Sequence, residues 1–433
     1  MSPKVLMISY AFPPRHSVGS LRSAKFAKYL PSLGWTPVVL TRAWNPEHED
    51  PTQQLTADII ATEYRDRLRL FRPNRSGGIT LPDGAWTDKQ TSGIKTRVRA
   101  FASYWLKEAL AFPDEEAGWV RPALSAARLA VRQHDISMLF STSPPVSSHV
   151  IASRLQRETG LPWIADFRDL WTQNHYIKHT LPRNALEEWL EKRTMRNAIH
   201  LATVSPTLAS QLSALHGKPT TVITNGYDHE DYQDAVPQIS DRFSLTYTGQ
   251  LYAGKRDPSL LFAALGGLVK RGSIKPDTFQ IRFYGPPGDV TLVRTLASEY
   301  GVEEFVVHHG SVTYSEAVMR QKESTALLLL NWDTPAERGV YTGKLFEYLG
   351  ARRPILAIPS LRGVVDELLT KTRAGVSAGT SAEVARVLEG WYGQFLRAGA
   401  VPYEGIDSAI GQYTREAQTV KLAELFEDAL CRR

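Results

Sequence analysis

Short aliphatic runs alternate with amphipathic stretches along most of the chain, and this alternation starts afresh after residue 241. In the first half, runs that favour strands occupy residues 5–9, 37–41, 68–71, 136–140, 163–166 and 199–204. In the second half they occupy residues 243–247, 280–284, 305–308, 326–330 and 354–358, with helix-like segments such as 258–271 and 290–300 between them. Such alternation is typical of β-α-β units around a parallel sheet. The sequence therefore predicts an α/β fold with two sheets.

The length of 433 residues supports two domains, because a single core stops growing at roughly 250–300 residues. The strong turn signal Asn-Gly-Tyr-Asp at residues 225–228 is followed by a polar segment that suits a linker. We expect an N-terminal domain over residues 1–228 and a C-terminal domain over residues 241–406. The amphipathic segment 407–433 either caps the second domain or packs back on the first.

The apolar start of the chain is too short for a signal peptide, and the longest aliphatic run, 326–330, is far too short to span a bilayer. Cys431 is the single cysteine, which fits a reducing cytoplasm. The net charge of +6 is concentrated between residues 61 and 108. Segment 93–112 has apolar residues at helical spacing with basic neighbours, so it either packs on the core or lies on an anionic membrane. No aromatic-basic motif indicates nucleic acid.

The loop after the first strand carries Arg15, His16 and Gly19 ahead of a predicted helix at residues 21–33. Ligands of open α/β sheets bind at this carboxyl end of the strands. The loop lacks the G-x-G-x-x-G pattern of dinucleotide enzymes, which removes the main support for a dehydrogenase. Gly19 allows close approach of a ligand, and Arg15 and His16 are candidate acceptor-binding residues; an ordinary connecting loop is the alternative.

Three glycine turns follow strands of the second half. The first, at Gly249 and Gln250, precedes the adjacent cations Lys255 and Arg256 and a helix that begins near Pro258. A helix N-terminus beside cations suits a pyrophosphate. The other turns contain Gly285 and the run Gly310-Ser311-Val312. If the strands are parallel, all three turns share one edge of the sheet.

Thr342-Gly343-Lys344 opens another predicted helix, and Glu347 follows about one turn later. Free backbone N–H groups and an ammonium group at this helix start would suit a phosphate. A carboxylate one turn further can accept both hydroxyls of a ribose. The alternative is that Glu347 only complements the helix dipole.

The Gly249 turn with its cations, the Gly310 turn and Lys344-Leu-Phe-Glu347, followed by Arg353-Pro-Ile-Leu, resemble family-4 retaining glycosyltransferases of the GT-B fold. The turn at residues 225–228 and the N-terminal loop resemble the same family, so the similarity covers nearly the whole chain. The resemblance implies two Rossmann-like domains that face each other across a cleft. It also implies transfer of a sugar, with retention, from a nucleotide-sugar in bacterial polysaccharide or glycolipid assembly.

The resemblance implies that Glu347 holds the ribose and that residues 342–344, with Arg256 or Lys255, hold the diphosphate. It places the base beside residues 310–312 and Gly19 opposite the donor phosphates. The implied donor site comprises Gly19, Gly249, Gln250, Lys255, Arg256, Gly285, Gly310, Ser311, Val312, Thr342, Gly343, Lys344 and Glu347. Two positions depart from the family: Gly339 stands where a glutamate is usual, and Gln250 where arginine is frequent.

In the first half, the strand at residues 163–166 ends in Asp166, followed by Arg168, Asp169 and Trp171. The charged residues either form ion pairs that fix the loop or shape the acceptor and sugar site, with Trp171 as an acceptor contact. His149 is a candidate acceptor base or sugar ligand, although a lone histidine is more often structural. We therefore take His149, Asp166, Arg168 and Asp169 as candidate catalytic residues.

The sequence contains no Asp-x-Asp motif, so we expect no metal and no cofactor besides the nucleotide-sugar donor. Cations and helix N-termini would stabilise the departing nucleoside diphosphate. The acceptor is expected to be a glycan, a lipid-linked saccharide or a small molecule. Two alternatives stay open: a GT-B nucleotide-sugar epimerase, which needs a pair of catalytic acids, and a binding or scaffold protein that has lost activity, which Gly339 favours.

Overall fold

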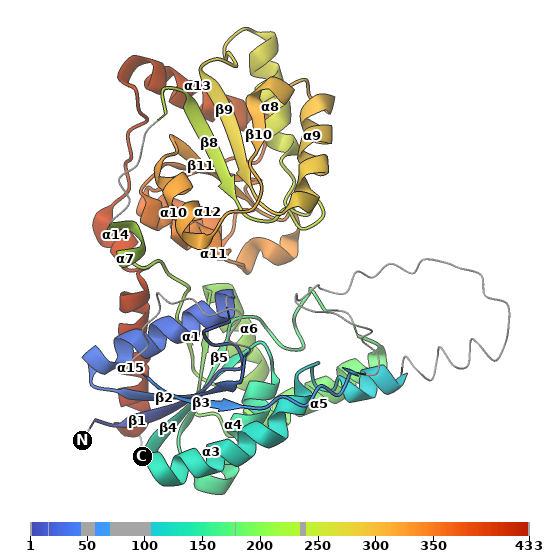
Figure 1. Ribbon diagram of the computed structural model, residues 1–433, viewed down its shortest axis with the longest axis vertical. Helices are drawn as coiled ribbons and strands as arrows, with labels where there is room; N and C mark the ends of the chain where they lie inside the picture. Colours follow the sequence, from blue (N-terminus) through green and yellow to red (C-terminus); the bar gives the residue numbers. More distant parts are fainter. Residues whose placement is uncertain are drawn as a thin grey trace, which may run out of the picture. The chain divides into compact units, whose positions relative to one another are not determined.

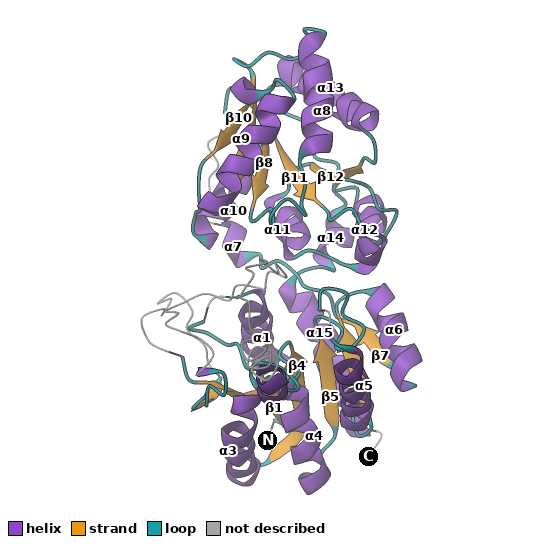
Figure 2. Cartoon of the chain, turned by 90° about the vertical axis from the view of Figure 1, so that its right-hand side faces the viewer, coloured by secondary structure: helices purple, strands orange, loops and turns teal. Residues whose placement is uncertain are grey.

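The computed structural model describes residues 2–431 except residues 16, 45–56, 70–104, 178 and 234–239. The chain forms two compact units (Figure 1). Unit 1 comprises Met1–Thr203, Leu212–Thr221 and Ala423–Arg433, and unit 2 comprises Val204–Gln211 and Val222–Leu422. Each unit is an open sheet flanked by helices, shown in orange and purple in Figure 2.

Among the described residues, unit 1 has a seven-stranded sheet in the order β3-β2-β1-β4-β5-β6-β7. The strands are β1 (Lys4–Ile8), β2 (Thr36–Arg42), β3 (Asp58–Thr62), β4 (Ile136–Ser143), β5 (Trp163–Phe167), β6 (His200–Thr203) and β7 (Thr220–Val222). The helices are α1 (Val18–Tyr29), α3 (Val120–His134), α4 (Ser147–Thr159), α5 (Leu181–Met195), α6 (Pro206–His216) and α15 (Arg415–Cys431). The last two begin in unit 2 and end in unit 1.

The central strands of unit 1, β1, β2, β4 and β5, are buried on both faces because helices cover both sides of the sheet, as expected of parallel strands. Alternate side chains such as Leu6 and Trp163 pack with residues of α3 and α4 in one core cluster. On the opposite face, the ring of Phe140 contacts Phe26 of α1 at 6.1 Å and Phe426 of α15 at 5.8 Å between centroids. The end of α15 is therefore part of the unit 1 core.

The described part of unit 2 has a six-stranded sheet in the order β10-β9-β8-β11-β12-β13. Its strands are β8 (Phe243–Thr248), β9 (Phe279–Tyr284), β10 (Val306–His308), β11 (Ala326–Leu330), β12 (Ile355–Ile358) and β13 (Gly375–Ser377). Its helices are α7 (Glu230–Gln233), α8 (Ser259–Lys270), α9 (Val290–Glu299), α10 (Tyr314–Lys322), α11 (Gly343–Ala351), α12 (Val364–Thr372), α13 (Ser381–Ala398) and α14 (Asp407–Gly411).

Two apolar clusters lie on opposite faces of the unit 2 sheet. Leu245 and Leu328 belong to the cluster with α8, α9 and α13, whereas Leu327 and Leu329 belong to the cluster with α11 and α12. Successive residues of β11 thus enter different clusters, which is the period of two that a strand imposes. Both faces are therefore covered, and functional groups gather where the strands end.

Each sheet reverses its strand order once, between β1 and β4 in unit 1 and between β8 and β11 in unit 2. The crevice outside the carboxyl ends of the strands at such a reversal is the usual ligand site of doubly wound sheets. In unit 1 the loops at this point follow residues Ile8 and Ser143. In unit 2 they follow Thr248 and Leu330.

The predicted α/β fold with two parallel sheets is confirmed. The strand expected at residues 68–71 is wrong for its described part, because residues 67 and 68 form a turn and Leu68 packs as a buried side chain. The third strand is instead β3, whose side chains are mostly exposed and so show no aliphatic run. No helix within the described ranges is long and apolar enough to span a membrane.

Candidate functional site

Gly249 and Lys344 meet at the strand-order reversal of unit 2. Gly249 follows β8 with φ of 134°, and its N–H donates to the carbonyl of Tyr284 at 2.6 Å. A Cβ at Gly249 would lie 1.9 Å from Cε and 2.2 Å from Nζ of Lys344. The positive φ favours glycine at this position, and a side chain there would displace the ammonium end of Lys344.

Lys344 and Arg256 form a cationic pair of groups without an acidic partner. In the described part of the chain neither side chain forms an ion pair with a carboxylate, and Nη1 of Arg256 donates to the Tyr247 hydroxyl at 3.4 Å. Burial and the Arg256 charge together lower the pKa of Lys344 to about 8, and the Glu347 charge opposes this effect. Two like charges held together in a partly desolvated place favour an incoming anion.

The N-terminus of α11 adds backbone donors to these cations. Thr342 is its N-cap but makes no side-chain capping bond, and its hydroxyl oxygen is buried without a hydrogen-bond partner. The first N–H groups of a helix have no intrahelical acceptor, and the helix dipole favours a negative charge there. Thr342, Gly343 and Lys344 together therefore present a phosphate-binding arrangement.

Glu347 lies one turn into α11 and is half-buried. Gln321 of α10 donates from Nε2 to Oε2 of Glu347 at 3.4 Å and to the Thr248 hydroxyl at 3.0 Å. The Thr248 N–H donates in turn to the buried Tyr348 hydroxyl at 3.1 Å. This network fixes the carboxylate beside the end of β8, where it can accept hydroxyl groups. Sequence patterns do not identify Gln321 or Tyr348, because neither belongs to a recognisable motif.

The other glycine turns continue the same edge of the sheet. The Gly285 N–H donates to the Gly310 carbonyl at 3.0 Å, and a Cβ at Gly285 would lie 2.5 Å from the Gly249 carbonyl oxygen. Ser311 donates from its hydroxyl to the Gly285 carbonyl at 3.4 Å. The structure therefore brings the three predicted turns together. Three further predicted residues lie around them: Val312 is half-buried in the Gly310 loop, Gln250 is exposed, and Lys255 is exposed with its ammonium 4.8 Å from the Trp332 ring.

The departure at Gly339 has a packing explanation. The Ser205 hydroxyl donates to the Gly339 carbonyl at 2.6 Å, and a Cβ at Gly339 would lie 2.6 Å from both Cβ and Cγ2 of Thr207. Residues 204–211 and 339 belong to the same compact unit. A glutamate cannot occupy position 339 while this contact stands. Glu337, two residues earlier, is buried.

Replacing Gly339 with alanine is expected to lower the free energy of unfolding by about 1–3 kcal/mol, because the new Cβ overlaps Thr207. Gly390→Ala is the matched control, since a Cβ there meets nothing within 4 Å. The Gly339→Ala, Thr207→Gly double variant should recover part of the loss. Chemical denaturation measures all three, and equal stability of Gly339→Ala and Gly390→Ala would refute the packing explanation.

In unit 1, Asp166 forms a buried ion pair with Arg22 of α1. Nε of Arg22 donates to Oδ2 at 3.1 Å and Nη2 donates to Oδ1 at 2.7 Å, and the Thr142 hydroxyl donates to Oδ2 at 2.7 Å. Asp166 is 0% and Arg22 2% exposed. The carboxylate therefore joins α1, which carries Gly19 in its first turn, to β4 and β5.

Arg168 and Gly19 lie in contact at the strand-order reversal of unit 1. Arg168 donates from Nε to the Ser143 carbonyl at 2.8 Å and from Nη2 to the Pro144 carbonyl. A Cβ at Gly19 would lie 1.5 Å from Nη1 of Arg168. Burial lowers the pKa of Arg168, while Asp169 and Asp166 oppose this effect. The guanidinium thus covers the first turn of α1, beside the half-buried Asp169.

His149 is fully buried in α4. Its Nδ1 is 2.8 Å from the Ser141 hydroxyl oxygen, which also accepts from Trp163 Nε1 at 2.8 Å, and its ring lies 4.5 Å from that of Phe167. Burial lowers the pKa of His149 to about 3. The imidazole is therefore neutral near pH 7 and surrounded by protein atoms. Its proposed role as acceptor base stays a prediction.

The wild-type chain is expected to lose stability relative to His149→Phe as the pH falls from 7.5 to 5. The unfolded chain takes up a proton at this position near pH 6.5, whereas the folded chain does so only near 3. Between pH 7.5 and pH 5, the free energy of unfolding of the wild type should therefore fall by about 2 kcal/mol relative to that of His149→Phe. Burial raises the pKa of Asp114 to about 6, which gives an opposite trend in both proteins and cancels in the difference. Urea unfolding of both proteins at several pH values measures this difference. If their free energies of unfolding changed in parallel with pH, a neutral His149 would be contradicted.

The remaining predicted residues of the first half are dispersed. Trp171 is buried in the unit 1 core, with Nε1 lacking a hydrogen-bond partner in the described structure. Arg15 is half-buried at the carboxyl end of β1. His16 lies outside the described residues, as does the 93–104 part of the amphipathic segment; residues 105–110 are helical, with Trp105 and Leu106 exposed.

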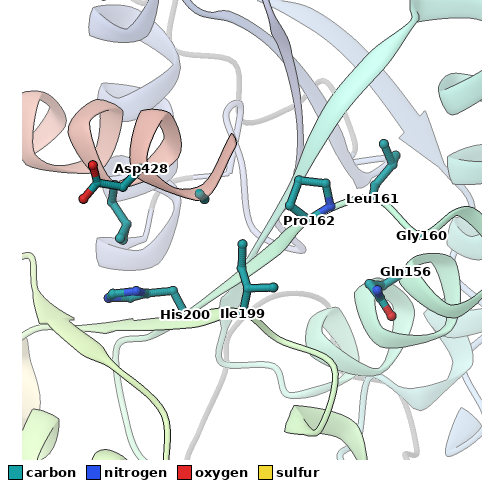
Figure 3. Close-up of a pocket in the computed structure, with 9 residues that line it drawn as sticks. Gln156, Gly160, Leu161, Pro162, Ile199, His200 and Asp428 are labelled. Carbon is teal, nitrogen blue, oxygen red and sulfur yellow. The ribbon is translucent and has the colours of Figure 1, made fainter. Parts of the chain in front are cut away.

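A shallow pocket of about 190 Å³ lies elsewhere in unit 1, at the amino ends of β5 and β6 (Figure 3). Pro162, His200 and Asp428 are among its lining residues. It occupies the edge of the sheet opposite to the strand-order reversal and contains none of the predicted site residues. Within the described residues, no group of three or more His, Cys, Asp or Glu side chains could hold a metal ion.

Comparison with known proteins adds to this geometry. Residues 20–226 match the family model of the glycosyl transferase 4-like domain. A search of curated protein sequences finds no match. Sucrose-phosphate synthase from Thermosynechococcus elongatus is a similar solved structure, with a TM-score of 0.61 and 13% identity over 100% of both chains.

Two further solved structures are similar to this chain. HepE from Anabaena in complex with UDP and glucose has a TM-score of 0.61 and 12% identity, over 98% of this chain and 100% of that one. The lipopolysaccharide outer core galactosyltransferase WaaB has a TM-score of 0.56 and 13% identity, over 98% of this chain and 99% of that one. At these identities the likeness shows the fold, which is GT-B.

Proposed function

We propose that the chain transfers a sugar from a nucleoside diphosphate sugar to an acceptor hydroxyl. The match of residues 20–226 to the glycosyl transferase 4-like domain and the GT-B fold support this proposal. In this proposal unit 2 holds the donor and unit 1 the acceptor. The transfer retains the anomeric configuration and needs no metal ion.

The unpaired Lys344 above Gly249, beside the uncapped start of α11, is the observation that carries the proposal. An ammonium group, a guanidinium and backbone N–H groups converge there, and such a set stabilises the negative charge that develops on a departing diphosphate. Glu347 lies one turn along the same helix, at the distance a ribose would occupy from the phosphates. The Gly310 loop borders the base.

The donor class is also supported by a relative. HepE has been solved with UDP-glucose, at 13% identity and a TM-score of 0.60. A diphosphate held by Lys344 and Arg256 can keep the leaving group on the face from which the acceptor attacks, and a diphosphate oxygen accepts the acceptor proton. This front-face course retains configuration without a protein nucleophile. Asp166 and His149, both fully buried, act as positioning residues in it.

We propose a role in the assembly of a surface polysaccharide or glycolipid. The similar structure WaaB is a lipopolysaccharide outer core galactosyltransferase, which favours an acceptor of this kind. The chain has a net charge of +6, and an excess of basic residues precedes the helix at 105–110. We therefore also propose that residues 93–112 contact an anionic membrane face.

Calorimetric titration with UDP-, GDP- and dTDP-sugars in EDTA tests the donor assignment. We expect saturable binding of one nucleotide class, weakened at least about tenfold by Glu347→Ala through loss of charge-assisted hydrogen bonds. Glu389→Ala, an exposed glutamate of α13, is the control and should bind normally. Absence of binding to every nucleotide-sugar would overturn the proposal and favour a binding protein that has lost its donor site.

A further inference from the structure

Five side chains form an aromatic and cationic group at the carboxyl ends of β1, β2 and β3. Tyr10 and Arg15 follow β1, Arg42 ends β2, Trp44 lies just beyond it, and Tyr64 follows β3. We name this set the Trp44 cluster. It lies at the same edge of the unit 1 sheet as Gly19 and Arg168, because parallel strands present their carboxyl ends together. None of Tyr10, Arg42, Trp44 and Tyr64 belongs to the site predicted from sequence.

Two guanidinium groups share one indole ring in this cluster. The Cζ atoms of Arg15 and Arg42 lie 4.2 and 4.4 Å from the Trp44 ring centroid. Arg42 also lies 4.3 Å from the Tyr64 ring, and its Nη1 donates to the Tyr10 hydroxyl at 2.7 Å. The Tyr10 and Trp44 rings meet edge to face at 5.5 Å. The aromatic groups therefore hold both cations in fixed positions.

The charges of this cluster are not neutralised. Within the described structure, neither arginine has an ion pair with a carboxylate, and Nε of Arg42 and Nε1 of Trp44 are buried without a hydrogen-bond partner. Burial lowers the pKa of Arg15, the Arg42 charge acts in the same direction, and Tyr10 and Glu116 oppose it. Among the described residues, Glu116 is the acid whose charge acts on Arg15, so two cations face one acid and the set keeps an excess positive charge.

Cations that are brought together and left unpaired cost free energy unless an anion joins them. A phosphate group fits best, because its terminal oxygens can accept from two guanidinium forks at once and its charge of about −2 balances both cations, whereas a carboxylate carries a single charge. The rings beside the forks offer an apolar face to the part of the ligand that carries the phosphate. Resting on the proposed function, we propose that the acceptor is a phosphate ester whose phosphate group is bound by Arg15 and Arg42 at Trp44.

A second arginine on a tryptophan ring in unit 1 provides the contrast. Arg193 lies 5.4 Å from the exposed Trp189 ring of α5, on the helical surface and with a single cation. One cation on an exposed ring is an ordinary surface contact. Two cations on one partly buried ring, at the strand ends where ligands bind, differ from an ordinary surface contact. The Arg193 pair therefore serves as the matched control.

The experiment compares glucose 1-phosphate with methyl α-glucoside, which share the sugar and differ in the phosphate. Each is titrated into the full chain with saturating UDP, so that the donor site is occupied, and into the chain without UDP. Tryptophan fluorescence and calorimetry report binding. We expect saturable binding of glucose 1-phosphate and none of methyl α-glucoside. Arg15→Gln and Arg42→Gln should each weaken binding at least about tenfold, and Arg193→Gln should not change it.

Binding of both sugars with equal affinity, no binding of either, or unchanged binding in Arg15→Gln and Arg42→Gln would overturn the proposal. The dodecyl phosphate diester of glucose identifies the source of the phosphate: tighter binding than glucose 1-phosphate supports a lipid-borne acceptor, and equal affinity supports a soluble one. UDP binding, measured separately, tests the donor site alone. If UDP, GDP and dTDP all fail to bind while glucose 1-phosphate binding is intact, the proposed function is refuted and the phosphate site still stands.

Discussion

Lys344→Gln is expected to weaken binding of the nucleoside diphosphate by roughly 10- to 150-fold, the range for loss of a hydrogen bond to a charged group. The ammonium group lies above Gly249 at the strand-order reversal, with no acidic partner among the described residues. Removing it leaves Arg256 and the α11 N-terminus as the remaining phosphate donors. Lys255→Gln is the control, because this neighbouring lysine is exposed and its ammonium lies 4.8 Å from the Trp332 ring.

Calorimetric titration of UDP into the wild type, Lys344→Gln and Lys255→Gln measures this effect. The pH supplies a second readout of the same group. Because burial holds the pKa of Lys344 at about 8 before the ligand binds, the free ammonium loses its proton above that pH and UDP affinity should fall. Lys344→Gln should lack this decline. Equal affinities of the two lysine variants would contradict the assignment.

Asp166→Asn is expected to lower the free energy of unfolding of unit 1 by about 3–5 kcal/mol. The substitution removes the negative charge opposite Arg22, whose guanidinium is buried and cannot reach water. An unpaired buried cation costs far more than the pair itself contributes. Adding Arg22→Met to Asp166→Asn should therefore restore part of the stability, because it removes the uncompensated charge.

Glu158→Gln is the matched control for Asp166→Asn. Glu158 also accepts two hydrogen bonds from one arginine, Arg128, at 2.7 and 2.6 Å, but that pair is about 40% exposed. An exposed pair of this geometry contributes about 1 kcal/mol or less. Urea unfolding of the four proteins distinguishes the cases. A loss in Asp166→Asn no larger than in Glu158→Gln would show that the buried pair does not join α1 to the sheet.

The fold could be predicted because its strands carry a strong signal. The run at 326–330 is purely aliphatic and coincides with β11, which is buried on both faces. The missed strands lack that signal: β3 is mostly exposed, and β7 and β13 have three residues each. Such short or solvated strands form through backbone hydrogen bonds with a neighbouring strand, so their side chains show no pattern from which the strand could be predicted.

The site could be predicted in part, for a related reason. Glycine turns and a helix start are local patterns, and parallel strands bring Gly249, Gly285 and Gly310 to one edge. Contacts between distant segments leave no local pattern. The approach of Arg168 to Gly19, the Asp166 pair with Arg22, and Thr207 beside Gly339 are such contacts. The Trp44 cluster is another, assembled from three strand ends.

Retention from a nucleoside diphosphate sugar without a metal is the central claim, and slow hydrolysis of the donor tests it without a known acceptor. In EDTA, the wild type with its preferred α-linked nucleotide-sugar should release the α-anomer first, seen by proton NMR before mutarotation, and Lys344→Gln should release far less. Initial release of the β-anomer, a requirement for added divalent metal, or release no faster than in buffer would contradict the account.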